Sequence, residues 1–440
     1  MRNRQAEEHV QAVLAGIANR ARISKQHRFG GVYTLLNEDL LRWSFYKLNR
    51  KAAPGVDDVT WEEYERNLDA NLAALVERLK RKAYKTRLVK RRYIPKGNGK
   101  RRPLGIPVLE DKLVQYAAKM ILEAIYEADF IEYSFAYRPE RSAKDAVNEL
   151  SFRLQFAPVG WVVEADIKGF FDNIDHEWML RMLEERIHDR AFVRLIGKWL
   201  KAGVLEDIHT VFHPGAGTPQ GGVISPILAN IYLHYALDLW FEKVVQKQAK
   251  GECLLIRYAD DFVCAFRYKA DAERFYNEQL QERLAKFSLE VAPEKTRMLR
   301  FTRFEVNKSE RFEFLGFEFR WGKNRHKQPQ VKRRTVRKKL RAACCELQAW
   351  IKKNRHKGLR PFMTTLARKL QGHWNYFGVP HNSKSLWRFY CHAIGLVYKW
   401  LNRRSQRRSF TWARLNTMLE RYGIPKPSIQ AKPKKRFAYV

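Results

Sequence analysis

Residues 254–266, LLIRYADDFVCAF, decide the fold predicted for this chain. Two apolar runs rich in β-branched and aromatic residues flank the adjacent acids Asp260 and Asp261, which predicts a β-hairpin with carboxylates at its tip. Neighbouring side chains of a regular strand point to opposite faces, so two consecutive aspartates can share one site only where the backbone turns. The alternative is that the acidic pair merely marks a polar turn.

The composition is that of a globular protein with a polyanionic partner. The 440 residues are 45% hydrophobic and 30% charged, and this length allows two or three domains with sizeable cores. Lys and Arg number 84 against 47 Asp and Glu, which gives a formal net charge of +37. Such an excess favours nucleic acid as the partner, with an anionic membrane surface as the second choice.

The positive charge is concentrated in the last part of the chain. Residues 321–440 hold 31 Lys and Arg but only two acids, whereas residues 1–320 hold 53 basic and 45 acidic residues. The chain ends in residues 425–440, whose Pro and Lys content predicts an extended basic tail. A nearly neutral front part and a nucleic-acid-binding back part are therefore expected.

Membrane insertion and disulfide bonding are both disfavoured. No apolar run approaches the roughly 20 residues of a membrane span, and residues 1–11 lack the core of a signal peptide. The five cysteines are odd in number and include no CxxC pair, so they predict reduced residues, mostly in the core, and no zinc site. We therefore expect a cytoplasmic, nucleoid-associated protein with no membrane partner.

A third acid, Asp166, ends a predicted buried strand within residues 159–187. A carboxylate at the end of a rigid strand is placed as a metal ligand would be. A turn and a helix follow, and Asp175 is well explained as the helix N-cap. Asp172 is explained as a turn residue and Phe171, taken alone, as an ordinary core aromatic.

Two further segments carry basic or glycine-rich loops. Residues 87–107 predict two strands around a Gly-Asn-Gly turn, with basic side chains that either face solvent or grip phosphate. Residues 213–241 open with a Gly-rich loop and pass at Ser225, as a cap, and Pro226 into a long helix. No Gly-Lys-Ser/Thr follows, so the loop is not a Walker phosphate loop. Its glycines suit close approach of the backbone to a flat base pair.

The remaining elements are predicted from apolar spacing. Helices are expected over 35–48, from a cap at Thr60 onward as one long helix, and over 270–287, with one strand over 312–321. Successive helices follow to the basic tail. Their large aromatic residues are expected mostly in the core: Trp350, Trp374, Tyr376, Trp387 and Trp400.

Several of these segments together resemble a known family. Tyr258 and Ala259 complete a YADD box, and residues 159–187 resemble the first catalytic motif of the polymerase palm. The string GTPQGGVISPILANIYL, residues 217–233, resembles the PQG motif of group II intron reverse transcriptases. GHWNYFGV and WLNRRSQRRSFTW resemble the thumb, or maturase, domain of the same family, and no Cys/His pattern of an HNH endonuclease follows. The likeness is to bacterial group II intron-encoded reverse transcriptase/maturases.

The resemblance implies an α+β right-hand polymerase with fingers, a palm built on an antiparallel sheet, and a helical thumb. Residues 1–86 would be an N-terminal extension and the start of the fingers, and 87–321 the fingers and palm. Residues 322–424 would form the strongly basic thumb or maturase domain, followed by the tail at 425–440.

The same resemblance implies a catalytic site. Asp166, Asp260 and Asp261 would bind two Mg²⁺ ions, with Mn²⁺ as a substitute and the backbone of Ile167 as a further ligand. The resemblance places further residues at the nucleotide: Lys96, Arg102, Lys168, Gly169, Phe170, Phe171, Gln220 and Lys295. Among them Phe171 would exclude a 2′-hydroxyl, and Lys295 would lie near the departing pyrophosphate unless it is only a surface lysine.

The basic C-terminal region suggests a surface for phosphates. One cluster in this region that is expected to bind nucleic acid is Arg403, Arg404, Arg407 and Arg408.

The implied function is RNA-directed DNA polymerisation. An RNA template, which can be the protein's own intron RNA, a DNA primer and deoxynucleoside triphosphates would be its partners, and a maturase role in intron splicing would be a second function. A host-adopted reverse transcriptase serving DNA repair or phage defence would share all of these motifs. A non-enzymatic RNA chaperone is disfavoured, because it would not need three acids placed in a basic protein.

Overall fold

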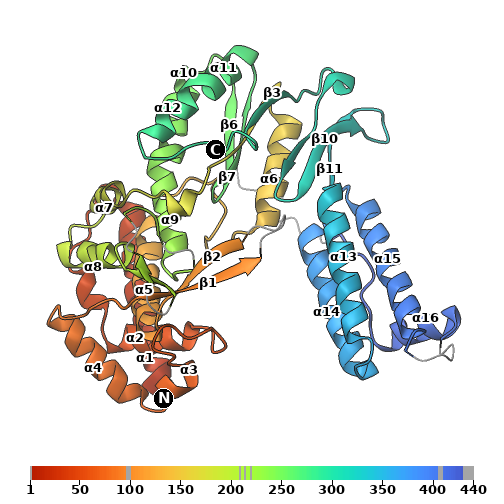
Figure 1. Ribbon diagram of the computed structural model, residues 1–440. Helices are drawn as coiled ribbons and strands as arrows, with labels where there is room; N and C mark the ends of the chain where they lie inside the picture. Colours follow the sequence, from red (N-terminus) through yellow and green to blue (C-terminus); the bar gives the residue numbers. More distant parts are fainter. Residues whose placement is uncertain are drawn as a thin grey trace.

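Helices and antiparallel sheets combine in this computed structural model, and the expected α+β class is confirmed (Figure 1). The structure describes residues 2–95, 101–207, 210–212, 215–218, 221–404 and 410–429. Three groups of elements are visible in Figure 1: N-terminal helices, a central sheet with its covering helices, and a C-terminal helical bundle.

The N-terminal helices pack around a long buried helix. These elements are α1 (Arg2–Ile23), η1 (Val32–Leu35), α2 (Glu38–Lys47), α3 (Trp61–Glu65), α4 (Leu68–Lys80) and the central α5 (Leu109–Tyr126). Thr60 caps α3 in a capping box with Glu63. The prediction of one long helix after Thr60 is wrong, because Asn67 leaves the helical region at φ −124° and ψ 37° and α4 begins at the next residue. This break lets the leucines of α4 face the core.

A small sheet, in the order β2-β1-β4-β5, confirms the predicted basic hairpin. It contains β1 (Val89–Pro95), β2 (Arg101–Ile106), β4 (Val204–Asp207) and β5 (Thr210–Phe212). β1 and β2 are antiparallel, with Ile94 opposite Arg102, while β1 runs parallel to β4. The hairpin projects from the N-terminal helices toward the C-terminal bundle in Figure 1.

The central sheet, in the order β6-β7-β3-β8, carries the acidic residues. Its strands are β3 (Trp161–Asp166), β6 (Cys253–Tyr258), β7 (Asp261–Phe266) and β8 (Arg297–Arg300). One face, including Val163 and Cys264, belongs to the same core as the N-terminal helices. The other, including Val162 and Val263, belongs to a second core with α6 (Ala143–Phe156) and three later strands. Burial on both faces explains why the strands around the YADD box are almost entirely apolar, with Arg257 as the charged exception in β6.

The helices that follow β3 along the chain are less regular than predicted. They are α7 (His176–Glu184), α8 (Arg190–Leu200), α9 (Ser225–Leu233), α10 (Gln246–Gln248), α11 (Lys269–Arg274) and α12 (Leu280–Ala285). Ser225 is the first residue of α9 and not its cap, which is Ile224. Three π-helical turns continue these helices: η3 (His234–Asp238), η4 (Phe241–Val245) and η5 (Phe275–Gln279).

The strand predicted over 312–321 is two strands. β9 (Phe312–Phe314) and β10 (Phe317–Lys323) meet at Leu315 and Gly316, whose φ angles are 49° and 79°. The chain reverses there, and the rings of Phe312 and Phe319 stack with centroids 5.0 Å apart. β11 (Pro329–Thr335) completes the sheet, and η6 (Val306–Lys308) precedes it.

Four helices form the C-terminal bundle: α13 (Arg337–Asn354), α14 (Leu359–Phe377), α15 (Ser383–Leu401) and α16 (Trp412–Arg421). Trp374 is fully buried in its core, and Trp350 and Trp400 pack against that core. Tyr376 and Trp387 are 41% and 47% exposed, so their expected burial is wrong. None of the helices in the described residues is long and apolar enough to cross a membrane.

Candidate active site

The three predicted aspartates lie at one end of the central sheet. Asp166 ends β3 and lies opposite Asp261, the first residue of β7, in the antiparallel register. Tyr258 pairs with Asp261 across the β6–β7 hairpin, which leaves Ala259 and Asp260 as a two-residue turn. Ala259 has φ 56°, a left-handed conformation that glycine normally adopts at the first position of such a turn. The turn therefore brings two consecutive carboxylates beside a third.

Mutual repulsion is evident in the electrostatics of this acidic group. Burial, followed by the charges of Asp166 and Asp260, raises the pKa of Asp261 to about 8. Burial, followed by the charge of Asp166, also raises the pKa of Asp260, while Lys295 and Arg102 act in the opposite direction. Carboxylates held together against their own repulsion favour a bound cation.

A fourth acid, Glu164, contributes to the raised pKa of Asp261 and was not predicted. Glu164 and Asp166 are two residues apart on β3, so strand periodicity places them on the same face. Arg297 of β8 pairs with Glu164 at 3.0 Å, and Glu164 is therefore partly neutralised. The two-residue spacing was the signal available in the sequence.

Lys295 supplies a cation of the protein itself. Its ammonium forms an ion pair with the Asp166 carboxylate, and this hydrogen bond is the main cause of the raised pKa of Lys295. In the part of the chain that the structure describes, no three His, Cys, Asp or Glu side chains form a ready-made metal site. The donor set nevertheless fits Mg²⁺ or Mn²⁺, because it consists of carboxylate oxygens that repel one another.

The turn after Asp166 is tied to the sheet. The Ile167 side chain is buried, so only its backbone is available to the site. The Lys168 N–H donates to the Glu290 carbonyl at 2.9 Å, and its ammonium lies 3.3 Å from the Glu290 carboxylate. Gly169, at φ 56°, then allows the short helix η2 (Phe170–Asp172) to form.

The two phenylalanines of η2 have different environments. Phe170 is buried in the core, whereas Phe171 is half-buried and contacts Phe170 with ring centroids 5.4 Å apart. The Phe171 carbonyl accepts a 2.8 Å hydrogen bond from the Thr218 N–H of the Gly-rich loop. Asp175 caps α7 by accepting from the Trp178 N–H, which confirms the N-cap prediction.

The Gly-rich loop needs glycine for contacts within the protein. A Cβ on Gly217 (φ 91°) would lie 2.7 Å from the Asp172 carbonyl oxygen, and one on Gly221 (φ 109°) equally close to the Gly105 carbonyl oxygen. The loop therefore packs closely against the turn after β3 at Gly217 and against the basic hairpin at Gly221. Close approach of this loop to a base pair remains a prediction. What the structure shows is that Gly217 and Gly221 pack against neighbouring backbone, where a side chain would not fit.

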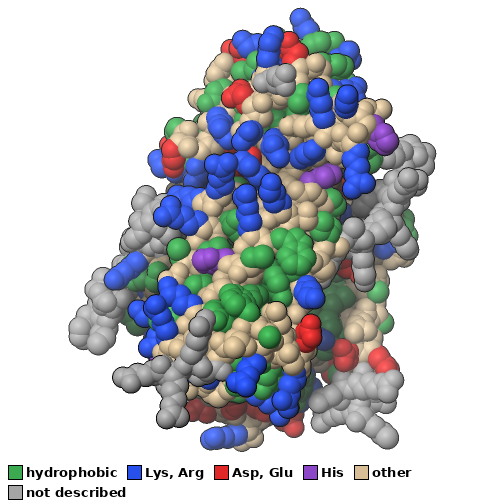
Figure 2. All heavy atoms as spheres, turned by 90° about the vertical axis from the view of Figure 1, so that its right-hand side faces the viewer, with side chains coloured by type: hydrophobic (Ala, Val, Ile, Leu, Met, Phe, Trp, Pro, Cys, Tyr) green, Lys and Arg blue, Asp and Glu red, His purple; other side chains and the backbone are tan. Residues whose placement is uncertain are grey.

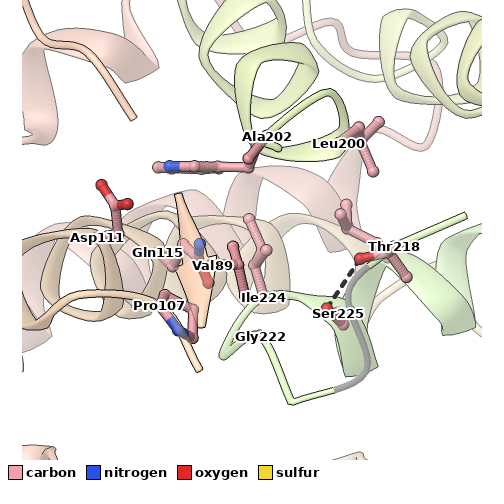
Figure 3. Close-up of a pocket in the computed structure, with 12 residues that line it drawn as sticks. Val89, Pro107, Asp111, Gln115, Leu200, Ala202, Thr218, Gly222, Ile224 and Ser225 are labelled. Atoms are coloured by element: carbon pink, nitrogen blue, oxygen red, sulfur yellow. Dashed lines mark hydrogen bonds between the residues drawn. The ribbon is translucent and has the colours of Figure 1, made fainter. Parts of the chain in front are cut away.

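Polar contacts fix the base of this loop (Figure 3). Thr218 and Ser225 hydroxyls are hydrogen-bonded at 2.8 Å, and the Gln115 side chain accepts from the Val223 N–H at 3.1 Å. The cavity that these residues line has a volume of about 10 Å³, room for one water molecule at most. The cavity is too small for a nucleotide, and the residues around it support the loop.

The basic hairpin reaches the site through Arg102. Arg102 is exposed on β2, and its charge acts on both Asp260 and Tyr137. Tyr137 is also exposed and has φ 57°, and burial followed by the charge of Asp260 raises its pKa. No sequence pattern pointed to Tyr137. Lys96 and Gln220 lie outside the described residues.

Figure 2 shows that Lys and Arg side chains gather in the upper half of the face that carries the C-terminal bundle and far outnumber the acidic ones, with a patch of hydrophobic side chains below them. Arg403 is exposed and lies over the Trp400 ring, 5.7 Å from its centroid. Arg404 is half-buried and donates to the Lys357 carbonyl at 3.3 Å. The structure thus separates two of the clustered arginines, and Arg407 and Arg408 fall outside the described residues.

Comparison with known proteins identifies the family of the chain. The family model described as reverse transcriptase (RNA-dependent DNA polymerase) matches residues 94–319. The chain is 29% identical to the group II intron-encoded protein LtrA of Lactococcus lactis, covering 95% of this chain and 83% of that protein. It is 37% identical to protein YkfC of Escherichia coli, over 48% of this chain and 62% of that one. The solved structure of apo telomerase from Candida tropicalis aligns at 15% identity with a TM-score of 0.47, covering 77% of this chain and 61% of that chain.

Proposed function

The chain belongs to the reverse transcriptase (RNA-dependent DNA polymerase) family, and from this premise we propose that Asp166, Asp260 and Asp261 form its catalytic centre. The single observation that carries this assignment is the register that sets Asp166 opposite Asp261, with Asp260 in the adjoining turn. The enzyme is an RNA-directed DNA polymerase with a right-hand fold, and an RNA template, a DNA primer and deoxynucleoside triphosphates are its proposed substrates.

The three carboxylates, with the backbone of Ile167, would hold two Mg²⁺ or Mn²⁺ ions. When bound, these cations lower the pKa of the primer 3′-hydroxyl and stabilise charge on the departing pyrophosphate. Asp166 is fixed by the strand end and Asp260 by the left-handed residue before it, so the ligands are held by rigid backbone.

Residues around the aspartates would bind and orient the nucleotide. Arg102 offers a guanidinium for the triphosphate, with Lys96 proposed beside it, and Gln220 is proposed to touch the nucleotide from the Gly-rich loop. Backbone groups from Lys168 to Phe171 would cradle triphosphate oxygens, although the Lys168 N–H is already bonded to Glu290. Phe171 would exclude a 2′-hydroxyl, and Lys295 would transfer its contact from Asp166 to the leaving group.

The proposed organisation places the fingers and palm in residues 87–321, after the extension at 1–86. Residues 322–424, before the tail at 425–440, would bind the duplex and structured RNA through arginines such as Arg403. This basic bundle favours a second role as a maturase that helps an intron RNA fold and splice. Its test is splicing of the flanking intron RNA, if one is found, at Mg²⁺ concentrations where the RNA alone is inactive.

A host-adopted reverse transcriptase, acting in DNA repair or phage defence, is the alternative to the intron-borne role. The flanking DNA discriminates between them. A surrounding intron RNA with its small catalytic hairpin supports the mobile element, and a bare gene among repair or defence genes supports adoption.

Extension of a DNA primer on an RNA template tests the polymerase assignment directly. The purified protein with deoxynucleotides and Mg²⁺ should produce full-length cDNA, and the double variant Asp260→Asn, Asp261→Asn should not. Extension that survives in the double variant would exclude this centre.

A further inference from the structure

A buried polar cluster lies directly beneath the YADD turn. Arg257 and Asp238 are both 0% exposed and form a two-pronged ion pair, with Nε–Oδ1 at 2.7 Å and Nη2–Oδ2 at 2.5 Å. The remaining Arg257 nitrogen, Nη1, donates to Asn230 Oδ1 at 3.2 Å and to the Ala259 carbonyl at 3.3 Å. One guanidinium therefore connects the turn residue before Asp260 to a buried helix.

The same cluster also contacts residues 133–136. Asn230, which is fully buried, donates from Nδ2 to the Ala136 carbonyl at 2.7 Å. The backbone of Arg257 also pairs with this segment, because its N–H donates to the Tyr133 carbonyl at 2.9 Å and its carbonyl accepts from the Phe135 N–H at 3.0 Å. Residues 133–136 are therefore fixed relative to the hairpin.

The bond from Arg257 ends on a residue in a left-handed conformation, and the bond from Asn230 ends next to one. Ala259 has φ 56° and precedes Asp260, and Tyr137 has φ 57° and follows Ala136. Such conformations cost free energy for residues other than glycine and persist only where the surroundings enforce them. Burial, followed by the charge of Asp260, the residue after Ala259, raises the pKa of the Tyr137 hydroxyl.

The helix geometry that builds the cluster is itself unusual. Asn230 lies in α9, immediately after the Gly-rich loop, and Asp238 lies in the π-helical turn η3 that follows α9. Positions 230 and 238 fall near one face of this helix. A π-helical turn is uncommon and is frequently found at functional sites. The cluster thus links three parts of the chain: helix α9 after the Gly-rich loop, the YADD hairpin, and residues 133–137, which we call the Tyr137 segment.

Stability alone gives a weak reason for such a cluster. A buried ion pair rarely stabilises a fold more than apolar residues of the same volume would, because both charges lose their hydration. A fixed geometry is the better-supported use of fully satisfied buried polar groups.

We propose that Asn230, Asp238 and Arg257 are positioning residues that hold the YADD turn and the Tyr137 segment at a fixed separation, so that Asp260 is presented for metal binding. This inference rests on the proposed role of Asp260 and Asp261. It assigns a purpose to three buried residues that do not themselves touch substrate.

Two variants test the proposal, with a third as a matched control. Arg257→Lys keeps the charge but loses the two-pronged geometry and the bond to Ala259. Asn230→Ala removes the bonds to Ala136 and to Arg257 Nη1 but leaves both contacts between Arg257 and Asp238 in place. Arg186→Lys is the control, because Arg186 is also buried and pairs with Asp129 at 3.0 Å, but in the N-terminal core. Thermal melting selects conditions in which all three remain folded.

The first readout is Mn²⁺ binding to the protein without nucleic acid, followed by the loss of the free Mn²⁺ signal in electron paramagnetic resonance. We expect about tenfold weaker binding in Arg257→Lys and Asn230→Ala, the size typical of a lost ligand-orienting contact. The second readout is the kinetics of adding one nucleotide. In the same two variants we expect kcat to fall by about tenfold or more, with KM for the nucleotide nearly unchanged. Arg186→Lys should match the wild type in both readouts, despite a lower melting temperature.

Three results would overturn the proposal. The first is wild-type Mn²⁺ affinity and kcat in folded Arg257→Lys and Asn230→Ala. The second is an equal loss in Arg186→Lys, which would assign the effect to stability. The third is failure of both test variants to fold, which would give the cluster a purely structural role. Failure of the proposed function is distinguishable, because then the double variant Asp260→Asn, Asp261→Asn would bind Mn²⁺ and extend primers as the wild type does.

Discussion

Lys295 and Asp166 form an ion pair across 129 positions of the chain, at the end of the strand that carries the first catalytic aspartate. The lysine side chain is 58% exposed and that of Asp166 is 18% exposed, so the pair lies at the border between the acidic group and solvent. The ammonium competes with any cation for Asp166. It is also placed to meet a negatively charged leaving group.

Lys295→Met should therefore change metal binding and chemistry in opposite directions. Mn²⁺ affinity of the free protein should rise by about two- to threefold, a small effect because exposed charges are screened by solvent. The rate of nucleotide addition should fall by about tenfold, since a cation near the departing pyrophosphate is lost. Titration of Mn²⁺ and single-turnover extension measure the two effects.

Lys308→Met is the control for Lys295→Met, because Lys308 forms an exposed ion pair with Glu305 at 3.0 Å outside the acidic group. It should leave both quantities unchanged. A fall in metal affinity in Lys295→Met would contradict the competition between lysine and metal.

The double variant Asp260→Asn, Asp261→Asn should separate chemistry from binding. Asparagine keeps the size of aspartate but removes the two carboxylates proposed to bind metal, so metal binding and DNA synthesis should be lost. Affinity for RNA should stay close to that of the wild type, because the positive charge lies mainly in the C-terminal region. Filter binding and primer extension on the same preparation are the measurements, and full-length cDNA would refute the site.

Phe171→Val tests the choice of sugar. Phe171 is half-buried beside the turn after β3, and a smaller side chain there should admit a 2′-hydroxyl. We expect ribonucleotide incorporation to rise by about tenfold relative to deoxynucleotides, the effect of about 1.4 kcal/mol. A competition assay with both nucleotides in one reaction measures the ratio. Unchanged discrimination would return Phe171 to a packing role.

Local sequence patterns were enough to predict individual strands and helix caps near the site. The arms of the YADD hairpin and the strand ending at Asp166 have unambiguous apolar runs, and Asp175 has the position and chemistry of a cap. The family resemblance supplied the grouping of the three aspartates. Register across the sheet, which sets Asp166 opposite Asp261, has no signature in a single sequence.

Other features depend on contacts between distant residues. Arg257 and Asp238 are charged, and charged residues are rarely fully buried unless they are paired, so nothing in the sequence alone marked them as core residues. The turn at Leu315 and Gly316 was hidden within an alternating pattern that continues on both sides. The pair of Lys295 with Asp166 joins residues 129 positions apart, and no local pattern specifies it.

Gly217→Ala should damage the site through the backbone of the Gly-rich loop. The new methyl group would lie 2.7 Å from the Asp172 carbonyl oxygen at a φ of 91°, so the loop must move. We expect a loss of about 1–3 kcal/mol in the free energy of unfolding, together with slower extension. Gly215→Ala is the matched control, since nothing lies within 4 Å of its added Cβ. Equal melting temperatures for the two variants would contradict the packing described for this loop.

Arg403 and Arg404 are neighbours in sequence but should respond differently to neutralisation. Arg403 is exposed over Trp400, whereas Arg404 is half-buried, with burial lowering its pKa, and donates to the Lys357 carbonyl. If Arg403 contacts a phosphate, Arg403→Gln should flatten the slope of log affinity against log salt by about 0.7 to 0.9. Arg404→Gln should lower the melting temperature and leave that slope nearly unchanged, because its guanidinium is engaged within the protein.

Salt titrations of RNA binding, with extension of a preformed primer–template at low salt, separate these outcomes. Extension should suffer less than binding in Arg403→Gln, because no catalytic ligand has been removed. A wild-type slope in Arg403→Gln would mean that nucleic acid follows another path over the basic bundle. A flattened slope in Arg404→Gln would mean that this side chain leaves Lys357 for a phosphate when nucleic acid binds.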